Sequence, residues 1–362
     1  MKYLYIPLIL LLLTSCAEEK KANPKPEHSK TDWAFYKLKG EVQSVSEKSV
    51  KLADGKTEPG HEVSSEHDTD MAFDDYGKLI HIKQWIKENM PYEETTYNGK
   101  DRVLKRTQYL GGTLLMITEN QWDASGENLT ATIRRNPDNS QIDRIENRYL
   151  KGKLTEKLIY NRQDTPVDKI TYEYDNDGNL ILENLYMGVA AVKVVSKYAY
   201  NDKKQKTNEA RYNQSKMNYQ TNFEYEGDKI IKKETLDSVG KPEYTELFNY
   251  DAAGNVTKHL TIERYDNSET VESFVYDKNN NVTSWIINKR GAPPVNITKT
   301  YDEQGNLLSS KTVQGENAVL EAHNYEYVYD KNGNWTSKKI FIKGKPSFQV
   351  ERKITYHTSE NK

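Results

Sequence analysis

Cysteine is almost absent from this sequence, since Cys16 is the only one among 362 residues. A single cysteine excludes an intrachain disulfide, and its position near the N-terminus leaves no thiol elsewhere for a Cys–His catalytic pair. The sequence also lacks the patterns H-E-x-x-H and G-x-S-x-G and a glycine-rich phosphate loop. We therefore predict a non-enzymatic protein with no catalytic residues and no cofactor.

An excess of charge of one sign is also missing. The 52 Lys and Arg residues nearly balance the 54 Asp and Glu residues, and both kinds are interspersed along the chain. This pattern gives no electrostatic reason for a nucleic-acid partner. Hydrophobic residues make up only 35% of the chain, which is low for a thick globular core, whereas 26 tyrosines argue against disorder.

The N-terminus carries an apolar run, Ile6–Leu13, which is much shorter than the ~20 residues of a transmembrane helix. It predicts a signal peptide over residues 1–15. The following "LTSC" resembles the lipobox of bacterial lipoproteins, in which the cysteine, here Cys16, is lipidated. The alternative is a chance cysteine behind an ordinary secretory signal. Residues 17–19, "AEE", resemble the surface-export signal of lipoproteins from the Bacteroidetes group.

These resemblances imply a protein that is lipid-anchored in the outer membrane and faces the cell exterior. We assign residues 16–31 to the lipidated N-terminus and a flexible tether, because this polar segment with two prolines cannot bury enough apolar surface to fold. Residues 32–357 form the predicted β-repeat array, with an atypical first unit as a cap. Residues 358–362 are a tail.

A repeat of about 25 residues runs through the array. Each unit begins with an aromatic residue at a turn, and successive aromatics are 24 to 28 residues apart: Phe73, Tyr97, Trp122, Tyr149, Tyr174, Tyr200, Tyr225, Tyr250, Tyr276, Tyr301, Tyr329 and Tyr356. Such a period indicates a repeat architecture in which units contact mainly their neighbours.

The best-preserved units share the pattern Y-D-x-x-G-N. We expect the Asp to accept hydrogen bonds from backbone N–H groups, and the Gly to adopt a positive φ, in a type I turn with a G1 bulge. Asn280 replaces Gly in one copy and tolerates the same conformation. The residues assigned to these turns are Tyr174, Asp175, Gly178, Tyr250, Asp251, Gly254, Tyr276, Asp277, Tyr301, Asp302, Gly305, Tyr329, Asp330 and Gly333.

Alternating sequences flank each turn and predict antiparallel strands. Many return strands end in aromatics two residues apart, such as Tyr172 and Tyr174, which places both rings on one face of the sheet. Two strands per unit give about 22–24 strands, too many for a flat open sheet. We predict an all-β fold: an elongated antiparallel β-meander coiled into a spiral or solenoid-like shell.

The unit resembles the YD (tyrosine-aspartate) repeat of the Rhs, or rearrangement hotspot, family over roughly residues 70–357. The family pattern usually continues G-R-L, whereas this chain has G-N-L, G-N-V or G-N-W, so contacts made through the family's Arg are not implied. In Rhs-type toxins such repeats form a hollow shell around a C-terminal toxic domain. Because this chain ends six residues after Tyr356, the toxin role is not expected to transfer.

Residues 60–75 form the most acidic segment and supply an alternative. A strand through Glu66, Asp68 and Asp70 would place three carboxylates on one side, as a site for a hard cation requires. The opposing interpretation is a solvated strand edge where charge discourages sheet-to-sheet pairing. A hydrolase or metal-dependent protein that uses this segment is therefore the first alternative function. An accessory or remnant of an Rhs-type toxin system is the second.

Tryptophan suggests where a ligand would bind. Exposed rings at Trp85, Trp122, Trp285 and Trp335 could stack on sugar rings, although aromatics with a period of two usually mark a packed face. Trp335 stands where other copies have Leu or Val, so Trp335, with Trp285, is the predicted ligand-binding residue. The sequence thus favours a binding or structural module for a glycan or an envelope protein.

Overall fold

The computed structural model describes residues 26–53, 56–63, 65–99 and 101–358, so Cys16 and the predicted signal peptide lie outside the described residues. Two short helices precede the strands, η1 (His28–Lys30) and α1 (Asp32–Phe35). The strands are β1 (Val42–Ala53), β2 (Lys56–Pro59), β3 (Asp68–Phe73), β4 (Leu79–Lys87), β5 (Met90–Asn98), β6 (Arg102–Leu110), β7 (Thr113–Trp122), β8 (Leu129–Arg135), β9 (Gln141–Leu150), β10 (Lys153–Tyr160), β11 (Pro166–Tyr174), β12 (Leu180–Met187), β13 (Ala191–Tyr200), β14 (Lys206–Asn213), β15 (Lys216–Glu226), β16 (Lys229–Leu236), β17 (Pro242–Tyr250), β18 (Val256–Glu263), β19 (Ser268–Tyr276), β20 (Val282–Lys289), β21 (Val295–Tyr301), β22 (Leu307–Gln314), β23 (Ala318–Tyr329), β24 (Trp335–Ile342) and β25 (Lys345–Tyr356).

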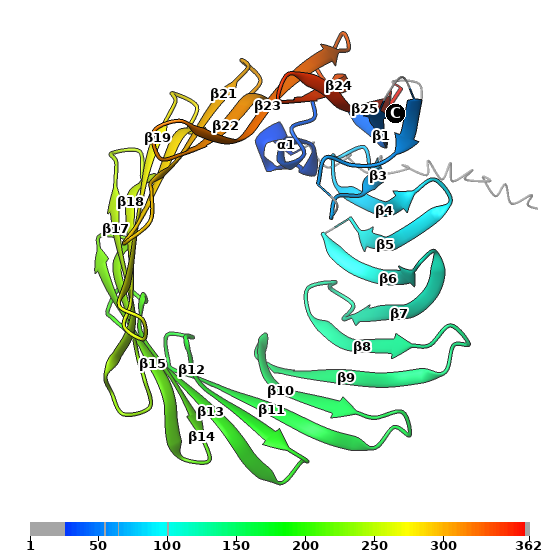
Figure 1. Ribbon diagram of the computed structural model, residues 1–362. Coiled ribbons are helices and arrows are strands. Elements are labelled where there is room, and N and C mark those ends of the chain that lie inside the picture. Colours follow the sequence, from blue (N-terminus) through cyan, green and yellow to red (C-terminus); the bar gives the residue numbers. More distant parts are fainter. Residues whose placement is uncertain (1–25, 54–55, 64, 100, 359–362) are drawn as a thin grey trace, which may run out of the picture.

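The strands form one antiparallel sheet that closes on itself (Figure 1). From β3 to β25 each strand pairs with the next along the chain, and β1 completes the ring by pairing with β3 on one side and β25 on the other. β2 extends the end of β1 as a hairpin. The other 24 strands make the barrel.

The all-β prediction is therefore confirmed, whereas the predicted spiral or solenoid-like shell is wrong. A spiral would leave two strand edges with unpaired backbone groups, and closure removes both edges. β1 lies in the segment that we assigned to an atypical cap, outside the 25-residue period. It pairs with β25 from Val42–Tyr356 to Lys51–Phe348 and thereby joins the two ends of the array.

The aromatic residues of the repeats face the inside of the barrel. α1 lies within the ring of strands (Figure 1), and its Trp33 packs in a cluster with Phe73 and neighbouring Tyr97. Residues paired across strands share a face, and faces alternate along each strand, so equivalent rings such as Tyr250 also point inward. Residues between them, such as Val275, form the outer face.

The barrel is too wide for its own side chains to fill. At ~4.8 Å per strand, 24 strands give a circumference of about 115 Å and a diameter of about 37 Å before tilt widens it. Accordingly, most strand residues are only half-buried. The one cluster of fully buried apolar residues in the described part of the chain lies where α1 covers the junction of β1, β3 and β4: Trp33, Leu38, Val42, Val45, Met71, Phe73 and Leu79.

The repeated tyrosines connect neighbouring repeats through their hydroxyl groups. The Tyr174 hydroxyl donates to the backbone oxygen of Leu154 at 2.9 Å, and Tyr250 donates to Ile230 at 2.7 Å. Each acceptor residue lies near the start of its strand. It comes before the first residue of that strand that pairs with the strand carrying the tyrosine. The hydroxyl therefore satisfies a carbonyl that the sheet leaves unpaired. The same bond is made by Tyr149, Tyr200, Tyr225, Tyr276 and Tyr301, and in the unit of Tyr329 by Tyr327, two residues earlier.

We expect Tyr250→Phe to lower the free energy of unfolding by about 1 kcal/mol, because the Ile230 carbonyl loses its donor while the ring stays in place. Tyr265→Phe is the matched control, since Tyr265 is 97% exposed and removal of its hydroxyl should change little. Urea unfolding of the three proteins measures the difference. Equal midpoints for all three would show that the hydroxyl bond is not stabilising.

No helix among the described residues is long and apolar enough to cross a membrane.

Candidate functional site

The turns of the Y-D-x-x-G-N units are held by the carboxylate and amide that the pattern repeats. In the copy that follows Tyr250, the Asp251 carboxylate accepts the backbone N–H of Asn255 at 2.8 Å and its side-chain amide at 3.0 Å. Gly254 has a φ of 94°, a conformation that favours glycine, and Asn280 occupies the equivalent position with a φ of 62°. The Asp and Asn side chains thus bond each other inside the turn.

These bonds make the turns sensitive to acid. The Asn255 amide and backbone N–H hold the pKa of Asp251 below its ordinary value, and the same donors lower the pKa of Asp175 and Asp277. A folded-state pKa below the unfolded one stabilises the fold fully above the unfolded pKa of about 3.9, and that contribution is lost progressively as the pH falls below this value and through the lower folded pKa.

We expect the melting temperature to fall between about pH 5 and pH 3, and to fall less steeply when Asp175, Asp251 and Asp277 are all replaced by Asn. Asparagine keeps an acceptor oxygen but does not titrate, so the triple variant should be less stable than the natural protein at neutral pH. Thermal unfolding across this pH range measures both effects. Parallel curves for the two proteins would rule out the turn carboxylates as the acid-sensitive groups.

The acidic segment 60–75 does not assemble its three predicted carboxylate ligands into one site. Asp68 accepts from His61 at 3.1 Å, Asp70 accepts from the Trp85 indole N–H at 2.7 Å, and Glu66 lies in the loop before β3 rather than on the strand. Among the described residues no group of three or more His, Cys, Asp or Glu side chains is arranged to hold a metal ion. Asp68, Asp70 and Trp85 instead line a cavity of about 240 Å³ beside β1 and β2.

Trp285 belongs to a polar network on the inner wall. Its indole N–H donates to Glu272 at 3.1 Å, and its ring stacks on Phe274 with centroids 5.9 Å apart. His259 lies between Glu272 and Glu246, at 2.9 and 3.1 Å, so both ring nitrogens can donate only when the imidazole is protonated. These contacts hold Trp285 against the wall of the barrel.

Trp335 lies in a different setting, in a cavity of about 260 Å³ between the N-terminal segment and the last repeats. The Arg352 guanidinium lies 3.4 Å from the centroid of the Trp335 ring, and Tyr327 contacts the ring edge-on. Leu38 and Gly333 also line this space, which we call the Trp335 pocket. The full lining is His28, Ala34, Lys37, Leu38, Lys39, Gln304, Asn306, Gly333, Asn334, Trp335 and Arg352.

Backbone and side-chain bonds fix the N-terminal segment over the Trp335 pocket. The Lys37 ammonium donates to the Gly305 carbonyl at 3.1 Å, and the Asn334 side chain bonds both the N–H and the carbonyl of Lys39, at 2.7 and 2.8 Å. Sequence reasoning found Trp335 because it departs from the repeat. It missed Lys37, Lys39 and Arg352, since no local pattern connects residues so distant in the chain.

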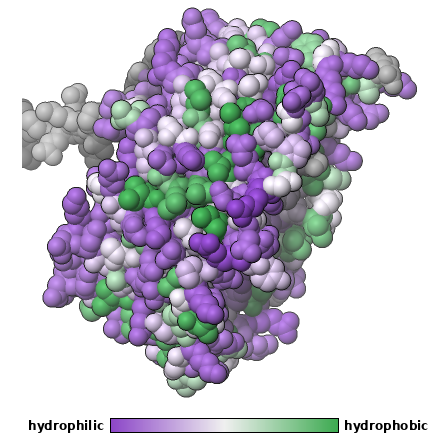
Figure 2. Space-filling model, turned by 60° about the vertical axis from the view of Figure 1, so that its left-hand side comes forward, coloured by the Kyte–Doolittle hydropathy of each residue, from purple (hydrophilic) through white to green (hydrophobic). Residues whose placement is uncertain are grey.

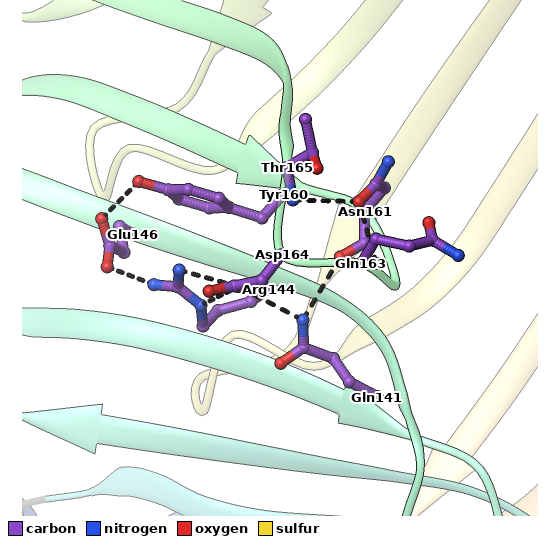
Figure 3. Close-up of polar contacts among 8 residues, drawn as sticks. All are labelled: Gln141, Arg144, Glu146, Tyr160, Asn161, Gln163, Asp164 and Thr165. Carbon is purple, nitrogen blue, oxygen red and sulfur yellow. Dashed lines mark hydrogen bonds and ion pairs between the residues drawn. The ribbon is translucent and has the colours of Figure 1, made fainter.

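A second polar cluster lies on the outer face, on β9, β10 and the turn that follows (Figure 3). The Arg144 guanidinium pairs with Glu146 and Asp164, and its centre lies 4.0 Å from the Tyr160 ring centroid. The Tyr160 hydroxyl donates to Glu146 at 2.8 Å. Because the charged groups of this cluster already pair with one another, we interpret it as a structural connection between β9, β10 and their turn.

Comparisons with known proteins do not assign a family. No protein-family model matches the chain, and no curated protein matches it. Similar solved structures include a Tc holotoxin pore of Photorhabdus luminescens, at 12% identity and a TM-score of 0.38 over 83% of this chain and 18% of that one. Another is a TcdB2–TccC3 structure, at 13% identity and 0.38 over 86% and 19%. A porin-like protein from Bacteroides uniformis has 9% identity and a TM-score of 0.26 over 87% and 96%.

The chain thus spans about a fifth of the length of these toxin chains. These matches assign neither a family nor a function.

Proposed function

We propose that this protein is a non-enzymatic lipoprotein, anchored in the outer membrane through Cys16 and exposed to the cell exterior, that binds a saccharide in the Trp335 pocket. The observation that carries the proposal is the pocket itself. An aromatic ring in a cavity with amide and charged side chains is the composition that polar ring ligands require. Asn306 and Gln304 supply amides and Trp335 supplies the ring.

The outer face of the barrel supports anchoring by a lipid. Lys169, Lys232 and Lys258 lie on this face within β11, β16 and β18, paired with Leu158, Leu247 and Ser273 on neighbouring strands. The space-filling view over β17 to β19 is mostly hydrophilic with separate apolar patches (Figure 2). Since a Lys that faces lipid at the bilayer midplane costs ~2–4 kcal/mol, such a face favours water. Metabolic labelling with a fatty acid, compared with a Cys16→Ser variant, tests the anchor, and protease treatment of intact cells tests the orientation.

Saccharide binding is tested with a glycan and cell-wall screen on the full chain and on Trp335→Leu, which places at this position the residue that other repeats use. We expect about tenfold weaker binding for Trp335→Leu, the loss of roughly one aromatic contact. Trp285→Leu is the matched control because it removes an inward tryptophan outside the Trp335 pocket, and it should bind normally. Loss of binding in the control alone would place the site at Trp285 instead.

An enzymatic role is tested on the same preparations. We expect no hydrolysis of the glycans or cell-wall fragments that bind. Hydrolysis that disappears in Asp68→Asn or Asp70→Asn would overturn the non-enzymatic proposal in favour of the acidic segment.

A further inference from the structure

The polar side chains of the Trp335 pocket are all cations or amides, with one exposed histidine. Among the described residues no Asp or Glu lines this cavity, although the chain has 54 acidic residues. The cationic groups come from two places that are far apart in the sequence. Lys37 and Lys39 follow α1 in the N-terminal segment, and Arg352 lies within β25. Folding thus brings three cationic side chains to one cavity, and Arg352 among them forms an ion pair with Glu47.

The two lysines keep their charges available. The Lys37 ammonium donates to the backbone carbonyl of Gly305, and an uncharged carbonyl does not neutralise the ammonium charge. No ion pair among the described residues uses the Lys37 or Lys39 ammonium, and both residues are exposed. Lys39 is held by its backbone to Asn334, so the side chain starts from a fixed point at the rim of the Trp335 pocket.

Arg352 is held more rigidly. Its Nε donates to Glu47 at 2.6 Å in an ion pair that offsets part of its charge, and the two terminal nitrogens take no part in that bond. Burial lowers the pKa of Arg352 and the Glu47 charge opposes this, so the guanidinium stays cationic, as arginine does in proteins. A planar guanidinium presents parallel N–H groups that fit the two oxygens of a carboxylate or phosphate.

The nearest turn carboxylates, Asp302 and Asp330, do not line the cavity that Lys37, Lys39 and Arg352 line. Asp302 accepts from Tyr329 and Asn306, and Asp330 accepts from Tyr356 and the backbone N–H of Asn334. Both are thereby engaged within their own turns. Glu47 pairs with the Arg352 Nε and also accepts from Thr69 at 2.7 Å.

We propose that the Trp335 pocket selects a saccharide that carries an anionic group, a carboxylate or a phosphate, on its ring. This proposal rests on the proposed function and names its ligand class. The anionic group is bound by Arg352, Lys37 and Lys39, while the sugar ring contacts Trp335 and the amides. The cavity of about 260 Å³ is below the ~300–1,000 Å³ of sites for drug-sized ligands, so it accommodates one terminal sugar residue rather than a long chain.

The test measures binding of the full chain, in detergent, to matched pairs of short oligosaccharides that end in a neutral sugar, its uronic acid or its phosphate ester. We expect the acidic members to bind at least tenfold more tightly than the neutral one, with an affinity that falls as salt is raised. In the double variant Lys37→Ala/Lys39→Ala the ratio of acidic to neutral affinity should fall by about tenfold.

Lys278→Ala is the control, because Lys278 is an exposed lysine in a repeat turn that does not line the Trp335 pocket, and it should keep the full preference. Equal binding of neutral and acidic members at the Trp335 pocket would overturn the anionic selectivity and leave the proposed function standing. Binding of none of the saccharides would overturn both. Tight binding of inorganic phosphate alone, with no gain from the sugar, would overturn the saccharide and identify a simple anion site.

Discussion

Trp33→Ala is expected to lower the free energy of unfolding by about 3–5 kcal/mol, the usual cost of removing a fully buried tryptophan. The Trp33 side chain is 4% exposed, and its indole N–H donates to the Val42 carbonyl at 2.8 Å. It also lies so close to Gly77 that a Cβ there would come within 2.5 Å of the ring. Trp33 therefore fixes both α1 and the turn before β4 to the only fully buried cluster found among the described residues.

Trp122→Ala is the control for this experiment. Trp122 also faces inward and its indole N–H also donates to a backbone carbonyl, that of Val103 at 3.0 Å, but the ring is only half-buried. We expect a loss of about 1–2 kcal/mol there, from the hydrogen bond and part of the apolar contact. Denaturant unfolding of both variants gives the comparison. Equal decreases in the free energy of unfolding would mean that the buried cluster at the junction stabilises the barrel no more than the half-buried wall does.

The 25-residue period predicted most of the strands because it reports local chemistry. The alternating residues after each turn specify strands, and the Asp, Gly and Asn of the turn specify how two strands connect. Closure is a contact between β1 and β25, whose paired residues Ser44 and Thr355 are 311 positions apart. No repeat pattern encodes such a pair, because β1 lies outside the period and has no YD turn.

The 25-residue period also did not predict the hydrogen bond that the tyrosine hydroxyl makes. The sequence shows Tyr more often than Phe at the position that opens each unit, and Phe is frequent two residues earlier. The structure supplies the reason, since Tyr250 reaches a carbonyl with its hydroxyl while Phe248 stacks on His259. Whether a position needs the hydroxyl depends on where the strand ladder ends, and that is a property of the assembled sheet.

The candidate site was partly predictable for a similar reason. Trp335 is a departure from its own repeat, and departures are visible in an aligned period. Arg352 and Lys37 look like any other charged residue on a polar chain, and only folding brings them to the same ring. Conversely, Asp68 and Asp70 looked like metal ligands as a sequence cluster, and the structure gives each a side-chain partner of its own.

Val45→Asp is expected to open the barrel. Val45 is 1% exposed on β1 and pairs with Ile354 of β25 and Met71 of β3, so the new carboxylate would be buried in the closing strand without a partner. Burying an unpaired charge costs several kcal/mol, and the strand can avoid this cost by detaching. Detachment of β1 would expose one edge on β25 and another on β3, and exposed edges pair with other chains.

We therefore expect Val45→Asp to increase the radius of gyration in X-ray scattering at low concentration and to self-associate in light scattering as concentration rises. Thr300→Asp is the control, because it adds the same charge to an exposed position on the outer face of β21. That variant should keep the size and stability of the natural protein. If Val45→Asp stayed monomeric with an unchanged radius, closure would not depend on the buried face of β1, and the pairing of β1 with both ends of the array would have to be maintained by its backbone hydrogen bonds alone.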